Sequence, residues 1–179
     1  MKWILPLCLV ASPALAETCP PVADHSEQLA DIVGQLKLSR GEGEARALTQ
    51  ELWSLWTDAP DALAQAMLDE GMQRRSNYDF LGARDVLDRL VEYCPEYAEG
   101  YNQRAFASYL GQDFEAALAD LDRALTITPN HIAALSGKGL TLMGLGRQDE
   151  AQEVLRSAVE MNPWLQERSL LVEPIGREL

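Results

Sequence analysis

The amino-acid sequence predicts an all-α protein in which one helical hairpin is repeated three times. Alanine and leucine recur throughout the chain while β-branched residues stay scattered, and this composition favours helices over strands. Prolines stand 34 residues apart at Pro95, Pro129 and Pro163, where each is expected to interrupt a helix and mark the end of a unit. The 47% share of hydrophobic and 24% share of charged residues is that of a folded globular protein.

The first sixteen residues have the pattern of an export signal. Lys2 supplies a positive charge, residues 3–11 are apolar, and Ala14 and Ala16 form the small-residue pattern that precedes a cleavage site. We expect cleavage after Ala16 and a mature protein in the bacterial periplasm. The alternative is an uncleaved membrane anchor, although a spanning helix needs roughly 20 apolar residues and this stretch is shorter.

The chain is acidic, with 28 Asp and Glu residues against 15 Lys and Arg residues and a formal net charge of −13. Such a surface repels nucleic acid and anionic lipid, so we expect neither as a partner. No segment after the signal is long and apolar enough to span a membrane. The acidity fits a cationic protein partner, but it also serves solubility alone.

Cys19 and Cys94 are the cysteines that remain once Cys8 leaves with the signal. Two cysteines in an exported protein predict a disulfide, which would fix the N-terminal segment onto the repeats. Closing so long a loop contributes on the order of 4 kcal/mol in the chain-entropy model. The alternative is a buried thiol at Cys94 and a free one at Cys19.

Two helices are expected before the clear repeats. Residues 17–27 form a linker, and residues 28–60 hold two amphipathic runs separated by a glycine-rich break. Leu36 and Leu48 are large residues where a tight helix crossing requires small ones. We therefore expect this degenerate hairpin to cap the N-terminal end of the array rather than to form a true repeat.

Several columns of residues keep the 34-residue period of the prolines. The columns are Gly71, Ala105 and Gly139; Ala83, Ala117 and Ala151; Leu87, Leu121 and Leu155; and Leu90, Ala124 and Ala158. Small residues allow the two helices of a hairpin to approach closely, so we expect the first column to face the second. The leucines are expected to fill the space between successive hairpins.

This pattern resembles the tetratricopeptide repeat, a helical hairpin of 34 residues. The resemblance implies an α-α superhelix, or solenoid, with repeats at residues 64–97, 98–131 and 132–165. Residues 166–179 are expected to form a short capping helix and a tail, because a solenoid must cover its last apolar face. Trp164, Leu165, Leu170 and Leu171 are the residues expected to do so.

The resemblance also implies a concave groove, lined by the first helix of each repeat, that binds a peptide or helix of a partner protein. Side chains at the groove positions are those of adaptable binding surfaces. The groove residues are Met72, Arg75, Asn102, Phe106, Tyr109, Leu140 and Met143. Phe106 and Tyr109 are expected to be apolar anchors, and Asn102 to hold the partner's backbone. In the alternative interpretation the same side chains pack against neighbouring helices or the N-terminal hairpin.

The inventory of reactive residues predicts no enzyme, no cofactor and no metal site. The chain has two histidines, His25 and His131, and we expect His131 in a surface turn. It has no Cys-x-x-Cys pair and no glycine-rich phosphate loop. The carboxylates of the repeats, Asp88 and Asp120 among them, are expected on the solvated surface. The basic residues with which some co-chaperones of this family clamp a partner's C-terminus are missing.

Two other functions remain open at this point. A structural subunit would self-associate through its ends, as a homodimer, if Leu155, Val159 and Trp164 stay partly uncovered. A thiol-redox role would have to use Cys19 and Cys94. The leading hypothesis is a periplasmic adaptor or scaffold.

Overall fold

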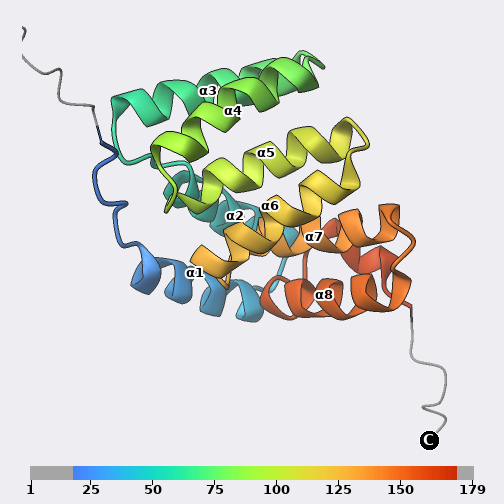
Figure 1. Ribbon diagram of the computed structural model, residues 1–179. Helices are drawn as coiled ribbons and strands as arrows, with labels where there is room; N and C mark the ends of the chain where they lie inside the picture. Colours follow the sequence, from blue (N-terminus) through green and yellow to red (C-terminus); the bar gives the residue numbers. More distant parts are fainter. Residues whose placement is uncertain (1–17, 173–179) are drawn as a thin grey trace, which may run out of the picture.

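The computed structural model describes residues 18–172, which form α-helices and one short 3-10 helix, with no strand among them. The elements are α1 (Ser26–Leu38), α2 (Glu42–Trp56), α3 (Ala62–Ser76), α4 (Phe80–Tyr93), α5 (Ala98–Leu110), α6 (Phe114–Ile127), α7 (Ile132–Gly144), α8 (Gln148–Met161) and η1 (Gln166–Leu170). Helices α3 to α8 stack as three antiparallel hairpins (Figure 1). The predicted all-α solenoid is confirmed, whereas the predicted signal, residues 1–16, lies outside the described residues.

The turn inside each hairpin repeats the same backbone conformation. Tyr78, Gln112 and Gly146 stand 34 residues apart and have φ angles of 64°, 62° and 75°. In each turn the next backbone N–H donates to the carbonyl five residues earlier, which satisfies the end of the first helix. Asp79 and Asp113 then cap the second helix by accepting from a backbone N–H. Only the third repeat has a glycine at the left-handed position.

The column of small residues faces the column of leucines inside each hairpin. A Cβ placed on Gly71 would lie 2.6 Å from Leu87 Cγ, and one on Gly139 would lie 2.5 Å from Leu155 Cγ. The leucines are thus the nearest neighbours of Gly71 and Gly139 inside the hairpins. Leu121 of α6 also reaches the next hairpin, where a Cβ placed on Gly137 of α7 would lie 3.3 Å from its Cδ2 atom.

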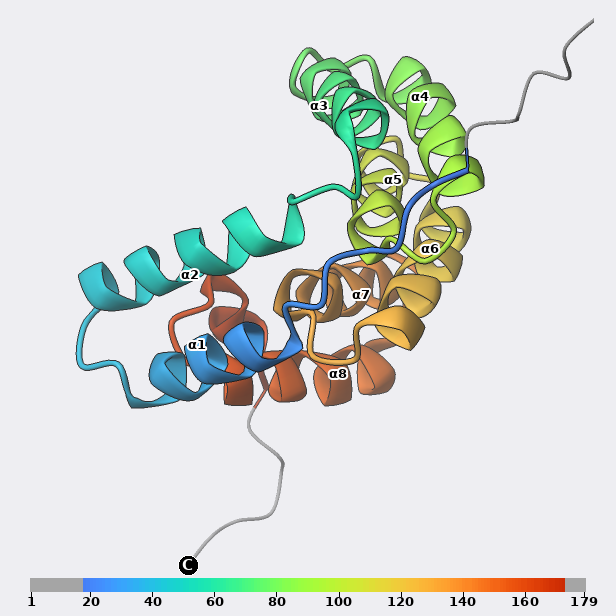
Figure 2. The same ribbon diagram turned by 90° about the vertical axis from the view of Figure 1, so that its left-hand side faces the viewer.

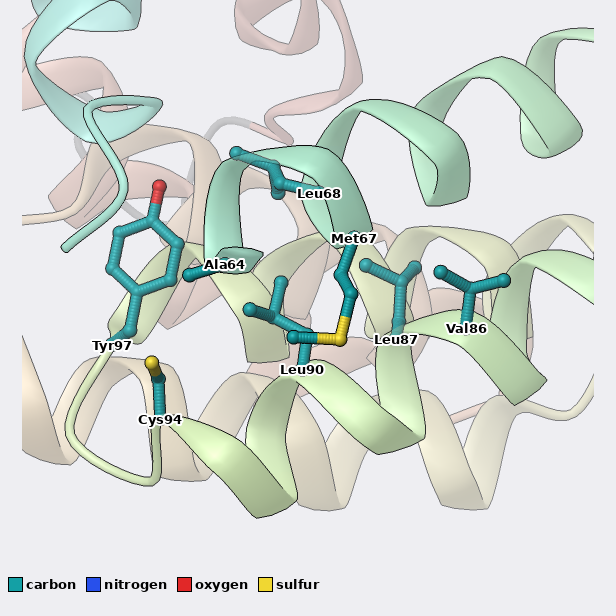
Figure 3. Close-up of a cluster of buried hydrophobic side chains, with 8 residues drawn as sticks. All are labelled: Ala64, Met67, Leu68, Val86, Leu87, Leu90, Cys94 and Tyr97. Atoms are coloured by element: carbon teal, nitrogen blue, oxygen red, sulfur yellow. The ribbon is translucent and has the colours of Figure 1, made fainter. Parts of the chain in front are cut away.

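The first repeat has a continuous apolar core between α3 and α4 (Figure 3). Its buried residues are Ala64, Met67, Leu68, Val86, Leu87, Leu90, Cys94 and Tyr97. The structure joins Cys94 to Cys19 by a disulfide with a Cα–Cα distance of 5.2 Å. Val22 also packs against this core. The N-terminal strap, residues 18–25, is thereby attached to the end of the first repeat.

The N-terminal hairpin, α1 and α2, folds back onto the third repeat. Its buried side chains, such as Leu36 and Leu52, share one cluster with Ile132 at the start of α7. Met161 and Trp164 pack against the same cluster. Figure 2 shows the hairpin beside α7 and α8, with the strap running to it from the end of α4. The expected position, at the N-terminal end of the array, is therefore not the one observed.

Two features, one at each end of the array, explain why the N-terminal hairpin packs on the third repeat. The disulfide holds the strap beside the loops between repeats, which brings α1 near the end of α8. The last hairpin of a solenoid exposes an apolar face that needs a cover. Leu36 and Leu48 are too large for a close hairpin crossing, but they suit this broader interface.

The C-terminal segment completes the cover of the third repeat. The cap is the 3-10 helix η1, and Gln152 Nε2 on α8 donates to the Leu170 carbonyl at 2.9 Å. Leu155 is fully buried and Trp164 is partly buried against the N-terminal hairpin. The apolar end on which the self-association hypothesis rested is thus largely covered.

An ion-pair network links α4, α5 and α6 across the first two repeats. Arg104 on α5 binds the Asp120 carboxylate through Nε at 2.8 Å and Nη2 at 2.5 Å, and its Nη1 lies 2.7 Å from Asp88 Oδ1 on α4. The bond to Asp120 is the largest cause that raises the pKa of Arg104. Asp120 is only 7% exposed, so its expected place on the solvated surface was wrong.

Candidate protein-binding groove

The seven predicted groove residues all lie on the first helices of the repeats. They are Met72 and Arg75 on α3, Asn102, Phe106 and Tyr109 on α5, and Leu140 and Met143 on α7. Four of them, Asn102, Phe106, Tyr109 and Leu140, line one hollow of about 270 Å³, which we call the concave hollow. The other three lie outside its lining.

Each of the three outlying residues has a different surrounding. Met72 packs against the core of the first repeat. The Arg75 guanidinium stacks over the Phe106 ring, 4.2 Å from its centre, and thereby borders the hollow indirectly. Met143 is half-buried near the end of α7. The sequence therefore predicted the four residues that line the hollow correctly, but Met72, Arg75 and Met143 do not line it.

Three residues that line the concave hollow lie outside the predicted groove positions. They are Trp53 of α2, Leu165 at the end of the third repeat and Glu167 of the C-terminal segment. The sequence predicted Leu165 only as a capping residue, and Trp53 reaches the hollow because the N-terminal hairpin folds back. The sequence offers only weak evidence for their position. Trp53 and Trp56 are large apolar residues on one helix, but that helix has no counterpart at the 34-residue period that would predict its contacts.

A buried polar cluster lies next to the hollow, centred on Glu99. Its carboxylate accepts from Asn102 Nδ2 at 3.1 Å, from Gln103 Nε2 at 2.5 Å and from His131 Nε2 at 2.8 Å. His131 Nδ1 accepts the Ala134 N–H at 3.3 Å, which leaves Nε2 as the ring nitrogen that donates to Glu99. Three donors thus compensate for the burial of the carboxylate.

His131 is also part of the junction between the N-terminal hairpin and the repeats. The Trp56 ring stacks on the imidazole, with 4.2 Å between centres and 16° between planes. Tyr97 reinforces the junction by donating from its hydroxyl to the Trp56 carbonyl at 2.8 Å. His131 is 1% exposed, so its expected place in a surface turn was wrong. A histidine that caps α7 here is buried because α2 covers it.

These contacts restrict what Asn102 can offer a partner. Its amide nitrogen is committed to Glu99, so only its carbonyl oxygen is left to accept a bond from a partner's backbone. The side chain is 7% exposed. Phe106 is 43% exposed, and among the large hydrophobic residues that line the hollow it is the exposed one.

Burial alters the ionisation of two residues around the Glu99 cluster. Burial, and secondarily the charge of Glu99, raises the pKa of the Tyr97 phenol well above its usual range. Burial also lowers the pKa of the Arg75 guanidinium, and the charge of Glu99 opposes that shift. Arg75 Nε is buried with no hydrogen-bond partner in residues 18–172.

Residues 18–172 contain neither a metal-binding cluster nor a membrane-spanning helix. No group of three or more His, Cys, Asp or Glu side chains in this range is placed to hold a metal ion. No helix in the same range has the length and hydrophobicity needed to cross a membrane.

Comparison with known proteins identifies the repeat. A tetratricopeptide-repeat model matches residues 110–163. A TPR repeat-containing protein of Rhizobium etli is 28% identical over 123 residues, which are 67% of this chain and 59% of that protein. A tetratricopeptide repeat protein 36 homolog of Nematostella vectensis is 35% identical over 65 residues, which are 36% of each chain. This chain therefore spans less than two thirds of the length of either relative.

A solved structure shares the arrangement of the hairpins. The TPR2B domain of yeast Sti1, in a complex named with pHsp70, superimposes with a TM-score of 0.55 and 26% sequence identity. The match covers 56% of this chain and 81% of that domain. The family model, these relatives and the 34-residue columns agree that the hairpins of this chain are tetratricopeptide repeats.

Proposed function

We propose that the protein is an adaptor that binds a segment of a partner protein in the concave hollow. The observation that carries the proposal is the hollow itself, where α2, α5, α7 and the C-terminal segment meet around mainly apolar walls. Phe106 and Tyr109 serve as anchors, with the Asn102 carbonyl available to a partner's backbone N–H. The Sti1 domain in complex with pHsp70 supports this role, because it has the same fold.

The N-terminal hairpin limits the length of segment that the site accepts. Trp53 and Leu165 line the hollow together with residues of α5 and α7. A partner segment in the hollow is therefore confined to the part of the concave surface beside α5 and α7. A short extended segment fits this space better than a long helix running through the whole superhelix.

The proposed location is the periplasm, after cleavage behind Ala16. Its support is the signal pattern in residues 1–16 and the cysteine pair, since disulfides persist in oxidising compartments. Mass measurement of the protein from the periplasmic fraction should give a chain that begins at Glu17. A mass that includes residues 1–16 would contradict the proposal.

The binding role is tested by replacing both anchors, Phe106→Ala with Tyr109→Ala. We expect the double variant to lose the partners that the unaltered protein captures from an envelope extract, because the apolar rim is removed. Tyr78→Ala is the matched control, since Tyr78 is an 83% exposed aromatic residue outside the hollow. Retention of the same partners by a folded double variant would rule out the hollow as the binding site.

A further inference from the structure

Glu167 is the only charged residue among the described residues that line the concave hollow. Its side chain is partly buried, and its carboxylate has no hydrogen bond or ion pair with another residue of the range 18–172. A partner that covers the hollow removes this carboxylate from water, which costs free energy unless the partner supplies a cation or a hydrogen-bond donor. The site therefore discriminates against partners that bring neither.

The basic residues near Glu167 are engaged elsewhere. Arg168 follows it in the chain, but the Arg168 guanidinium donates from Nη1 to the Pro163 carbonyl at 3.0 Å. Arg46 of α2 donates from Nη2 to Glu42 Oε1 at 3.0 Å, so its charge is balanced on its own helix. A cation that compensates Glu167 must therefore come from the partner.

A second depression adjoins the concave hollow at Glu167. Trp53, Leu165 and Glu167 line both depressions. The second one, of about 570 Å³, also has polar side chains of α2 such as Thr49 and Gln50 in its lining, and we call it the side groove. An aromatic ring and a carboxylate thus lie at the same rim, and both attract cations. The side groove has room for a long basic side chain beside that rim.

We propose that the site selects a partner segment in which a lysine or arginine stands next to an apolar residue. The apolar side chain enters the concave hollow against Phe106 and Tyr109. The basic side chain enters the side groove, where its cation pairs with Glu167 and lies near the Trp53 ring. Successive residues of an extended segment rise only about 3.3 Å and point in different directions, so neighbours can reach two depressions that share a rim. This inference rests on the proposed binding function and names the class of segment that the site selects.

The test is a selection of random peptides, displayed on phage, against the purified protein and its variants. We expect the peptides that bind the unaltered protein to carry Lys or Arg next to an apolar residue. Glu167→Gln should remove this enrichment of basic residues. Glu167→Lys should select Asp or Glu at the same place instead, because the charge at the rim is reversed.

The affinity of one selected peptide, measured by isothermal titration calorimetry, gives the size of the effect. Glu167→Gln should weaken its binding about threefold to tenfold, because the pair lies between an exposed ion pair and a buried charge-assisted hydrogen bond in strength. Replacing the basic residue of the peptide by glutamine should weaken binding to the unaltered protein by a similar factor.

Glu115→Gln and Glu115→Lys are the matched controls. The protein has a net charge of −13, which by itself attracts basic peptides, and these variants change that charge by the same amounts as the variants of Glu167. Glu115 is an exposed residue of α6 that lines neither depression, and its carboxylate has no hydrogen bond or ion pair in residues 18–172. Its replacement should leave the selected sequences and the affinity unchanged.

The proposal is overturned by any of four results. The selection yields no binding peptide, the selected peptides lack the basic residue, the enrichment survives in both variants of Glu167, or the variants of Glu115 have the same effect as those of Glu167.

The two proposals can fail separately. If the Phe106→Ala, Tyr109→Ala variant loses its partners from the envelope extract while Glu167→Lys captures the same partners as the unaltered protein, the adaptor site stands and the selection of a basic residue is refuted. If the double variant keeps its partners while the peptide preference follows the charge at Glu167, the adaptor site is refuted and the charge preference stands.

Discussion

At the scale of single residues, the turns of the three hairpins differ in how well their side chains suit the backbone. A left-handed conformation brings a Cβ close to the neighbouring backbone, which glycine avoids. Gly146 occupies this position in the third repeat, whereas Tyr78 and Gln112 occupy it in the first two. The first two turns therefore hold backbone strain that the third does not.

Gln112→Gly should relieve this strain. We expect the free energy of unfolding in urea to rise by about 0.5–1 kcal/mol, because the lost steric penalty exceeds the entropy that glycine adds to the unfolded chain. Gly146→Gln is the reciprocal control and should lower the free energy of unfolding by a similar amount. Shifts of the same sign in both variants would contradict the explanation.

The close approach of helices at Gly139 gives a second prediction at this scale. A Cβ there would lie 2.5 Å from Leu155 Cγ, and Leu155 is fully buried. Gly139→Ala should therefore lower the free energy of unfolding by about 1–3 kcal/mol through overpacking. Thermal unfolding followed by circular dichroism would measure the change.

Gly34 provides the control for this substitution. It lies inside α1, and a Cβ placed on it would meet nothing within 4 Å. Gly34→Ala should stabilise the protein by about 0.5–1 kcal/mol, because alanine favours the helix. An equal loss of stability in both variants would show that the close contact with Leu155 is not the cause.

At the scale of elements, the strap connects two parts of the fold that the sequence separates. The disulfide spans a sequence separation of 75 residues and holds the strap to the first repeat. From there the strap leads to α1, which packs on α8. The strap is therefore the covalent tie between the first repeat and the cover of the third.

Removing this tie, by Cys19→Ala with Cys94→Ala, should lower the free energy of unfolding by about 4 kcal/mol in the chain-entropy model. The measurement is urea unfolding under oxidising conditions. Unaltered protein treated with a thiol reductant should lose the same amount, and the double variant should not respond to the reductant. If the reductant leaves the free energy of unfolding of the unaltered protein unchanged, the prediction that the disulfide stabilises the fold is wrong.

At the scale of the whole molecule, the sequence predicted whatever repeats and missed what occurs once. The repeated residues that include Gly71 and Leu87 predicted the three hairpins, because equivalent residues make the same contact in each repeat. The place of the N-terminal hairpin could not be read this way, since its partner Ile132 lies about a hundred residues further along the chain. The burial of His131 was missed for the same reason, because its cover is Trp56.

The same distinction applies to the residues of the candidate site. Asn102, Phe106, Tyr109 and Leu140 follow from their positions in the repeat, and the structure brings them together around one hollow. Trp53 and Glu167 belong to segments without a repeat period, so the sequence pattern gives no information about their contacts. The commitment of Asn102 to Glu99 was likewise invisible, because it depends on how deeply α5 is buried.

The fold-back of the N-terminal hairpin changes how this array should come apart. In an open row of hairpins each unit touches only its neighbours, so an end can fray while the middle persists. Here α8 cannot separate from the array without breaking its contacts with α1. Helix α1 is in turn linked through residues 18–25 and the disulfide to the first repeat, at the other end of the array. Because the two ends of the array are linked in this way, we expect the whole molecule to unfold cooperatively in a single transition.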